Sequence, residues 1–165
     1  MDIDEHFRRD DLKRYALQCG LAGLVVLILL LVLDAVTQTV LIASLGASAF
    51  IAFAVPRSPH SGPRNMIGGY VVGIFAGIVM SASHDYLQAA GGWDHAAMVL
   101  FGALAISLAM FVMVVTRTEH PPAASLALGL VLNDWSFVTL LVVLGGVIIL
   151  SIAKRIVLPM LLDLV

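Results

Sequence analysis

The residues best suited to binding chemistry stand around a His-Pro-Pro triplet. His120 precedes Pro121 and Pro122, and an apolar stretch follows them. Proline is favoured in the first helical turn, where its missing N–H would have lacked a partner in any case. The triplet therefore predicts a helix that begins here. The N–H groups of Ala123 and Ala124 then face outward from its positive end, which is a natural anion site.

Two side chains near this helix start are also suited to an oxyanion. His120 at the cap position is a possible donor, and Ser125 lies one position beyond the two free N–H groups. Arg117 is expected to capture an anion at the mouth, whereas Glu119 would repel it unless a cation neutralises the carboxylate. The alternative interpretation is an ordinary helix start that His120 caps.

A second set of donors lies in and before the loop Ala54–Asn65. Arg64 and Asn65 come directly before a Gly-rich segment, where Arg64 either attracts an anion or anchors the chain at the membrane surface. Ser44 and Ser48 are four residues apart in the preceding apolar segment. A hydroxyl gains nothing from facing lipid, so these serines favour a polar path slightly over a packing surface.

Small residues recur at every fourth position after this loop. Gly69, Gly73 and Gly77 line one helix face and allow another backbone to approach closely. The first interpretation is a packing surface. The alternative is the thin wall of a pore.

Catalytic and metal chemistry is not predicted. His84-Asp85 and Asp94-His95 contain metal-ligand residue types but no helical or strand spacing, so we expect them in a solvated loop. The single Cys19 excludes a disulfide framework and a zinc cluster, and nucleophile and phosphate-loop motifs are absent. We expect no enzyme activity, no cofactor, no metal and no nucleic-acid partner.

The composition around these residues indicates lipid as the solvent. Hydrophobic residues make up 61% of the chain and charged residues 12%, against about 45–50% and about 25% in soluble domains. Four segments have about the length that a bilayer core requires: Tyr15–Leu33, Met66–Ser83, Ala96–Thr116 and Ser136–Ala153. We interpret the first as a retained signal anchor, since a cleavable signal peptide has a shorter apolar region.

Two further segments are less typical. Thr39–Val55 is long enough to cross but rich in Ser, Ala and Gly, and Pro121–Leu132 has only 12 residues. A helix of that length reaches about 18 Å of a core of about 30 Å. It is therefore either a half-helix or a short span that continues through Asn133, Asp134 and Trp135.

The distribution of positive charge favours six crossings. If all six segments cross, the 9 Lys and Arg residues all fall on the cytoplasmic side. They are Arg8, Arg9, Lys13, Arg14, Arg57, Arg64, Arg117, Lys154 and Arg155. We expect both termini in the cytoplasm, with a segment 1–14, a transmembrane domain 15–155 and a tail 156–165.

Six crossings also divide the chain into two three-span halves of opposite orientation, as in many transporters. Ala43-Ser44-Leu45 matches Ala124-Ser125-Leu126, although matches this short arise by chance in so biased a composition. The expected fold is an all-α membrane protein of about six transmembrane helices with a short fifth helix. Two inverted three-helix repeats are an open alternative within that fold.

Two stretches together resemble the HPP family of integral membrane proteins. One runs from Leu45-Gly46-Ala47-Ser48-Ala49 through Pro56, Ser58-Pro59 and Pro63-Arg64-Asn65 to Gly68-Gly69, and the other is Thr116-Arg117-Thr118-Glu119-His120-Pro121-Pro122-Ala123-Ala124. The resemblance implies a small multi-span protein, and some relatives are assigned nitrite transport across bacterial or chloroplast membranes. Many relatives have Gly after the Pro-Pro-Ala run, where this chain has Ala124.

An anion pathway is the function that these observations favour. An anion in low dielectric needs oriented donors in place of water, and helix N-termini, hydroxyls, His120 and Arg64 are such donors. No predicted span has an internal acidic residue, which disfavours a cation carrier. We expect a transporter or channel for a small inorganic anion, nitrite first, in a bacterial inner membrane. The alternative is a non-transporting membrane subunit that forms a homo-oligomer through its Gly/Ser stripes.

Overall fold

The computed structural model describes residues 16–27, 39–91 and 94–164. Within these ranges the chain forms 6 α-helices and no strand, which confirms the expected all-α fold. The helices are an N-terminal helix Ala16–Leu27, α2 Thr39–Ala54, α3 Pro63–Ala89, α4 Asp94–Thr116, α5 Pro121–Leu132 and α6 Phe137–Val157. Short 3-10 helices, η2 Pro59–Ser61 and η3 Leu158–Met160, follow α2 and α6.

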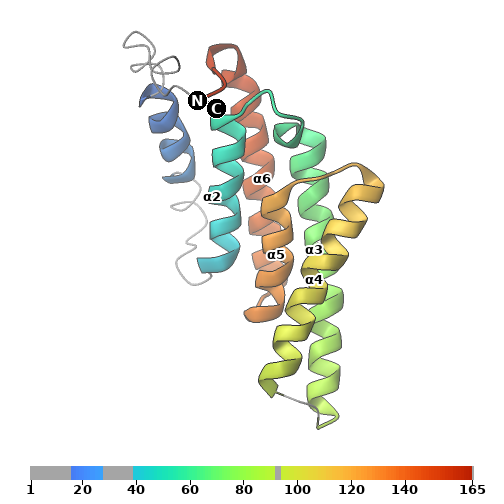
Figure 1. Ribbon diagram of the computed structural model, residues 1–165. Helices are drawn as coiled ribbons and strands as arrows, with labels where there is room; N and C mark the ends of the chain where they lie inside the picture. The colour runs from blue at the N-terminus through green and yellow to red at the C-terminus, as the bar shows by residue number, and fades with distance from the viewer. Residues whose placement is uncertain (1–15, 28–38, 92–93, 165) are drawn as a thin grey trace, which may run out of the picture.

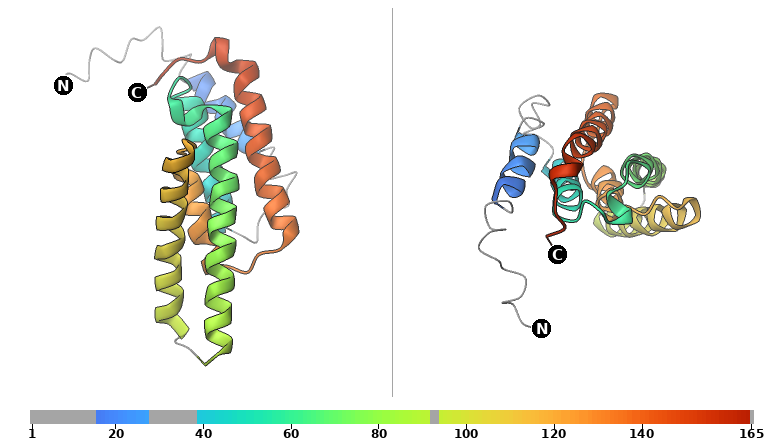
Figure 2. Two further views of the ribbon diagram at one scale, coloured as in Figure 1. Left: turned by 90° about the vertical axis from the view of Figure 1, so that its right-hand side faces the viewer. Right: turned by 90° about the horizontal axis from the view of Figure 1, so that it is seen from above.

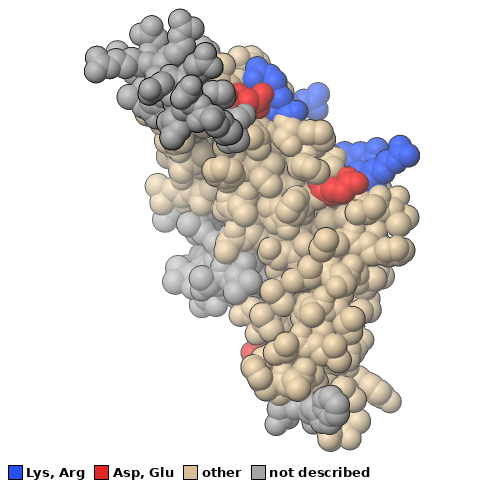
Figure 3. Space-filling view, in the orientation of Figure 1, with Lys and Arg blue, Asp and Glu red and all other residues tan. Residues whose placement is uncertain are grey.

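Successive helices run in opposite directions, so the connections gather at two ends of the bundle (Figure 1). The loop between α2 and α3, the connection between α4 and α5 and the end of α6 lie together at the upper end. We call this the basic end, because the Lys and Arg side chains visible in Figure 3 lie there and the segments that carry all the described Lys and Arg residues meet there. They are Arg57, Arg64, Arg117, Lys154 and Arg155.

Three helices are long and apolar enough to cross a bilayer by length and composition: those at Pro63–Ala89, His95–Thr116 and Phe137–Met160. Helix α5 has 12 residues, which confirms the predicted short segment. It is nevertheless well enclosed, because α2, α3 and α4 all pack against it (Figure 2). Its side chains Leu126, Ala127 and Leu130 are fully buried.

The glycine stripe of α3 makes this arrangement possible. A Cβ on Gly69 would lie 2.6 Å from the Cβ of His120, and one on Gly77 would lie 2.8 Å from the Cβ of Leu130. A Cβ on Gly73 would collide with the carbonyl oxygen of Ala123. The stripe is therefore the surface on which α5 packs, in agreement with the packing interpretation.

Helix α3 extends beyond the predicted span at both ends. Pro63 begins the helix after the Gly62 cap, and the helix continues past Ser83 to Ala89 through a stretch that contains no Pro or Gly. The prediction that His84 and Asp85 lie in a solvated loop is wrong: both are helical, and His84 is buried against the ring of Phe101. The predicted crossing Tyr15–Leu33 lies only partly within the described residues, which show helix from Ala16 to Leu27.

The α3–α5 contact predicts a sharp difference between two glycines. Gly73→Ala should lower the free energy of unfolding by about 1–3 kcal/mol, because a methyl group there overpacks a backbone contact. Gly145→Ala in α6 meets nothing within 4 Å, so it should leave stability unchanged or raise it by up to about 1 kcal/mol. Unfolding of both variants in detergent micelles measures the difference. Equal midpoints would contradict the close approach of α5 to α3.

Candidate functional site

His120 is held in the middle of a polar cluster at the basic end of α5. It occupies the N-cap position, but its side chain makes no capping hydrogen bond. The ring turns inward instead and is fully buried. Its Nδ1 lies 2.9 Å from the carbonyl oxygen of His60 in η2, and its Nε2 lies 2.8 Å from the Oγ of Ser48 in α2. The interpretation of His120 as a side-chain cap is therefore wrong.

Hydroxyl groups continue the cluster from His120 into the apolar core. The Oγ of Ser48 lies 2.8 Å from the Oη of Tyr70, and Tyr70 donates to the Oγ of Ser44 at 3.2 Å. All four side chains are buried. We call His120, Ser48, Tyr70 and Ser44 the hydroxyl row; it joins α2, α3 and the start of α5.

Tyr70 is the member that sequence reasoning missed. It lies in α3, three residues before Gly73 and seven before Gly77, so it shares the helix face that packs on α5. A tyrosine within an apolar span needs a partner for its hydroxyl. The spacing of Tyr70 from Gly73 and Gly77 was therefore the signal in the sequence that could have identified it.

A more exposed rim surrounds the hydroxyl row. The carbonyl oxygen of Glu119 accepts hydrogen bonds from the Nδ2 of Asn65 at 3.1 Å and from the Nδ1 of His60 at 2.9 Å. Arg64 donates to the carbonyl oxygen of Thr116 at 3.1 Å. The predicted pair Arg64 and Asn65 thus borders the site without contacting His120, and it ties α3 to the connection before α5.

Three predicted residues do not join the cluster. The N–H of Ala123 donates to the carbonyl oxygen of His120 at 2.9 Å, so it is not free for an anion. Ala124 is only partly buried, and Ser125 is exposed and lines a surface hollow together with Ala47 of α2. Ser44 is buried whereas Ser125 is exposed, so the Ala-Ser-Leu match between α2 and α5 does not extend to their environments.

Arg117 occupies a strained position at the end of α4. Its φ is 55°, the left-handed region that favours glycine. Thr118 N–H bonds to the carbonyl oxygen of Met113 at 2.9 Å, and Arg117 N–H bonds to that of Val114 at 3.3 Å. This is the Schellman ending of a helix. It turns the chain sharply from α4 toward His120 and leaves the Arg117 side chain exposed.

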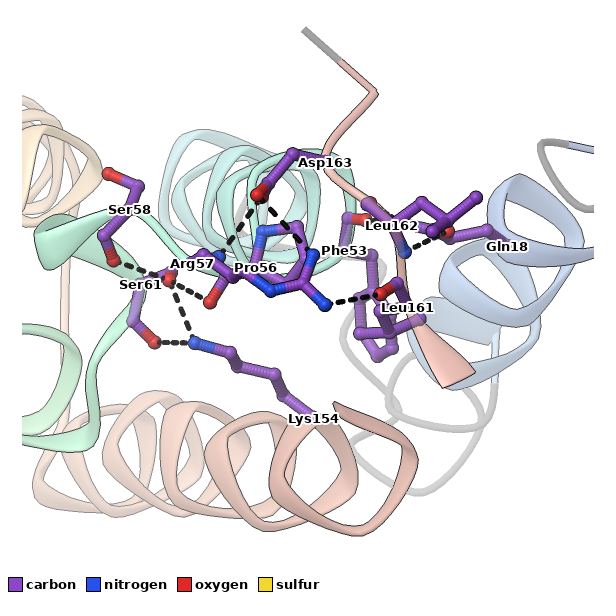
Figure 4. Close-up of polar contacts among 10 residues, drawn as sticks. All are labelled: Gln18, Phe53, Pro56, Arg57, Ser58, Ser61, Lys154, Leu161, Leu162 and Asp163. Carbon is purple, nitrogen blue, oxygen red and sulfur yellow. Dashed lines mark hydrogen bonds and ion pairs between the residues drawn. The ribbon is translucent and has the colours of Figure 1, made fainter. Parts of the chain in front are cut away.

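A second polar cluster closes the same end of the bundle (Figure 4). Lys154 in α6 points toward η2, where its Nζ donates to the carbonyl oxygen of Ser61 at 2.5 Å and to the Oγ of Ser61 at 2.7 Å. The Oγ of Ser61 also donates to the carbonyl oxygen of Pro56 at 2.7 Å. Lys154 thereby fixes the loop that carries His60.

The C-terminal residues cross over this loop. Asp163 accepts from the backbone N–H of Arg57 at 3.1 Å and pairs with its guanidinium at 3.4 Å. Gln18 of the N-terminal helix receives a hydrogen bond from the N–H of Leu162 at 3.1 Å and donates to the Leu162 carbonyl oxygen at 2.7 Å (Figure 4). Loop, tail and N-terminal helix therefore form one hydrogen-bonded unit.

The buried polar side chains of the described residues are basic or neutral. In the described residues the buried polar side chains are Gln18, Ser44, Ser48, Ser61, Ser81, His84, Thr118, His120, Ser151 and Lys154, with no carboxylate among them. Those residues also hold no group of three metal-ligand side chains. The arrangement offers hydroxyls, an imidazole and an ammonium group as hydrogen-bond partners for an anion.

His120 lies in the connection before α5, outside the three long spans. Burial lowers its pKa to about 4, against an opposing effect of its hydrogen bond to His60. At neutral pH the free site therefore holds a neutral imidazole. A hollow of about 360 Å³ adjoins His120 between α4 and α5, but its lining is apolar apart from His120 and Glu119.

Comparison with known proteins places the whole helical region in one family. The model of the HPP transmembrane region matches residues 8–157. Two transmembrane proteins of Dictyostelium discoideum are 41% identical over 96 residues and 34% identical over 88 residues. These matches cover 58% and 53% of this chain but only 31% and 26% of the relatives. No solved structure matches. The chain belongs to the HPP family of multi-pass transmembrane proteins.

Proposed function

We propose that this protein is a transporter or channel for a small inorganic anion, with nitrite as the first candidate. The observation that carries the proposal is the set of buried polar groups. In the described part of the chain these groups are hydroxyl, amide, imidazole and ammonium, and no buried carboxylate balances them. Carboxylates typically mark intramembrane sites for cations. Hydrogen-bond donors without carboxylates suit an anion, because the loss of its hydration costs a large free energy.

The position of these groups supports the same proposal. The hydroxyl row begins at the basic end, where Arg64 and Arg117 raise the local concentration of anions. It then enters the core through α2 and α3, so an anion drawn to the mouth meets donors in sequence. We place this mouth on the cytoplasmic face of a bacterial inner membrane, with both termini on that side.

The burial of most stripe residues favours transport over the alternative of a non-transporting subunit. Its basis was assembly through small-residue stripes, but Gly69, Gly73 and Gly77 are covered by α5 of the same chain. Ser44 and Ser48 are buried in the hydroxyl row. These stripes are therefore unavailable to a second copy.

The direct test is anion flux through purified protein in proteoliposomes. Nitrite should enter faster than into protein-free vesicles, while Na⁺ and K⁺ should not. Ser48→Ala removes a donor within the row and should lower kcat/KM for nitrite about tenfold, the usual loss for a hydrogen bond to a charged group. Ser107→Ala is the matched control, because that hydroxyl is exposed on α4 and bonds only to Ala103.

Absence of flux for nitrite, nitrate and chloride would reject the proposal. Flux that Ser48→Ala leaves unchanged would keep an anion pathway but move it away from the hydroxyl row. The melting temperature of each variant separates lost transport from lost folding.

The proposed role of Arg117 predicts a salt-dependent effect. Arg117→Asn removes the charge but keeps a residue that tolerates a positive φ. At about 0.01 M salt, where the Debye length is about 30 Å, uptake should fall by about twofold to tenfold. At about 1 M the length is about 3 Å, so the difference from wild type should vanish. Arg117→Lys should retain uptake. A loss independent of ionic strength would instead indicate a structural role.

A further inference from the structure

The hydrogen bond between His120 and His60 fixes which ring nitrogen carries hydrogen. The partner of Nδ1 is a carbonyl oxygen at 2.9 Å, which only accepts. Nδ1 must therefore carry the hydrogen. A neutral imidazole has one N–H, so Nε2 of neutral His120 is a bare lone pair. Ser48, 2.8 Å away, has to donate to it.

The rest of the hydroxyl row then has two possible directions. If Ser48 donates to His120, its oxygen must accept from Tyr70, 2.8 Å away. Tyr70 has a single hydrogen, however, and its geometry also directs that hydrogen to Ser44 at 3.2 Å. When Tyr70 donates to Ser44, Ser48 donates to Tyr70, and His120 must donate to Ser48 through a protonated Nε2. The same heavy-atom positions thus serve a neutral and a protonated His120.

This proton count restricts how His120 can serve an anion. An anion accepts hydrogen bonds and does not donate them, so it cannot pair with a bare Nε2. The only N–H of the neutral ring is already bonded to His60. An anion that replaces Ser48 at Nε2 therefore requires a second proton on the ring.

We propose that anion binding at His120 takes up one proton on Nε2, so that the protein carries a small anion and a proton together. The inference rests on the proposed function and names the proton gradient as the energy source of transport. The proton comes from bulk water and forms the Nε2–H bond, and the anion accepts that hydrogen. One positive and one negative charge then move together, so transport is electroneutral.

The ionisable groups around His120 are compatible with this coupling. Glu119 precedes it in the chain, His60 faces it from η2 and Tyr70 faces it from α3. Arg64 lies at the rim on Thr116, and Lys154 bonds to Ser61 next to His60. The described part of α2 and all of α5 have no ionisable side chain. When the ring is protonated, Tyr70 accepts the hydrogen of Ser48, and Ser44 accepts the hydrogen of Tyr70.

Burial keeps the ring neutral until an anion arrives. The lowered pKa of His120, about 4, means that the empty site holds no extra proton at neutral pH. A bound anion raises this pKa, because an opposite charge favours the protonated form. By linkage, a lower pH strengthens anion binding by the same coupling. At pH values between the pKa of the free His120 ring and the higher pKa of the anion-bound ring, each increase of one pH unit should raise the apparent KM for nitrite about tenfold.

The first experiment separates proton coupling from passive flow. Proteoliposomes with equal nitrite on both sides receive either an acid-outside pH gradient or a potassium diffusion potential with valinomycin. The pH gradient should drive net nitrite uptake beyond that of protein-free vesicles, and the potential alone should drive none. Uptake driven by the potential and not by pH would overturn the inference while leaving the proposed function intact. Lack of flux even under a nitrite gradient would instead reject the proposed function.

A variant of the row tests whether His120 takes the proton. Tyr70→Phe keeps the buried ring but removes the acceptor that Ser48 needs only when His120 is protonated. Its profile of apparent KM against pH should shift to lower pH by about one unit, the equivalent of one hydrogen bond. Ser107→Ala should leave the profile in place. A Tyr70→Phe protein that folds normally and keeps the wild-type profile would place the proton elsewhere and refute the role of the row.

Discussion

Close contact between the backbones of α3 and α5 fixes the geometry on which the rest of the bundle depends. Gly69, Gly73 and Gly77 present no side chain to α5, so this helix of 12 residues lies within the space between α2, α3 and α4. In lipid such packing replaces the hydrophobic effect as the source of helix association. The contact also sets the depth of His120, whose Cβ lies against Gly69.

Because α5 begins inside the bundle, the polar groups at its start need hydrogen-bond partners. Water is scarce there, and each unpaired polar group costs several kcal/mol in hydrocarbon, or about 1–3 kcal/mol in protein interiors. The loop at η2 supplies the His60 carbonyl, and Lys154 holds that loop through Ser61. The tail, through Asp163, holds Arg57 at the start of the same loop. The second polar cluster therefore supports the first, although they share no hydrogen bond.

The number of helices and their alternation were predictable, but the orientation of helix faces was not. Apolar length and the placement of Lys and Arg depend on the bilayer, which acts on every segment in the same way. When lipid and protein core are equally apolar, the sequence pattern does not show which face of a span points inward. Ser44 and Ser125 stand in the same Ala-Ser-Leu context, yet one is buried and the other exposed. The glycine spacing of α3 did reveal a face, and Tyr70 could have been found from it.

The depth of the hydroxyl row constrains how an anion would cross. The row lies between the basic end and Ser44, and beyond it α5 contributes the apolar side chains Leu126, Ala127, Leu130 and Val131 to the core. These side chains offer an anion no donors, so under the proposed function the pathway is closed on that side. Opening it requires α5 to move against α2 or α3. The glycine contact limits where α5 can tilt, and an anion bound to protonated His120 would replace the hydrogen bond that joins His120 to Ser48 in α2. Proton uptake would therefore act on the one junction that must change for the other side to open.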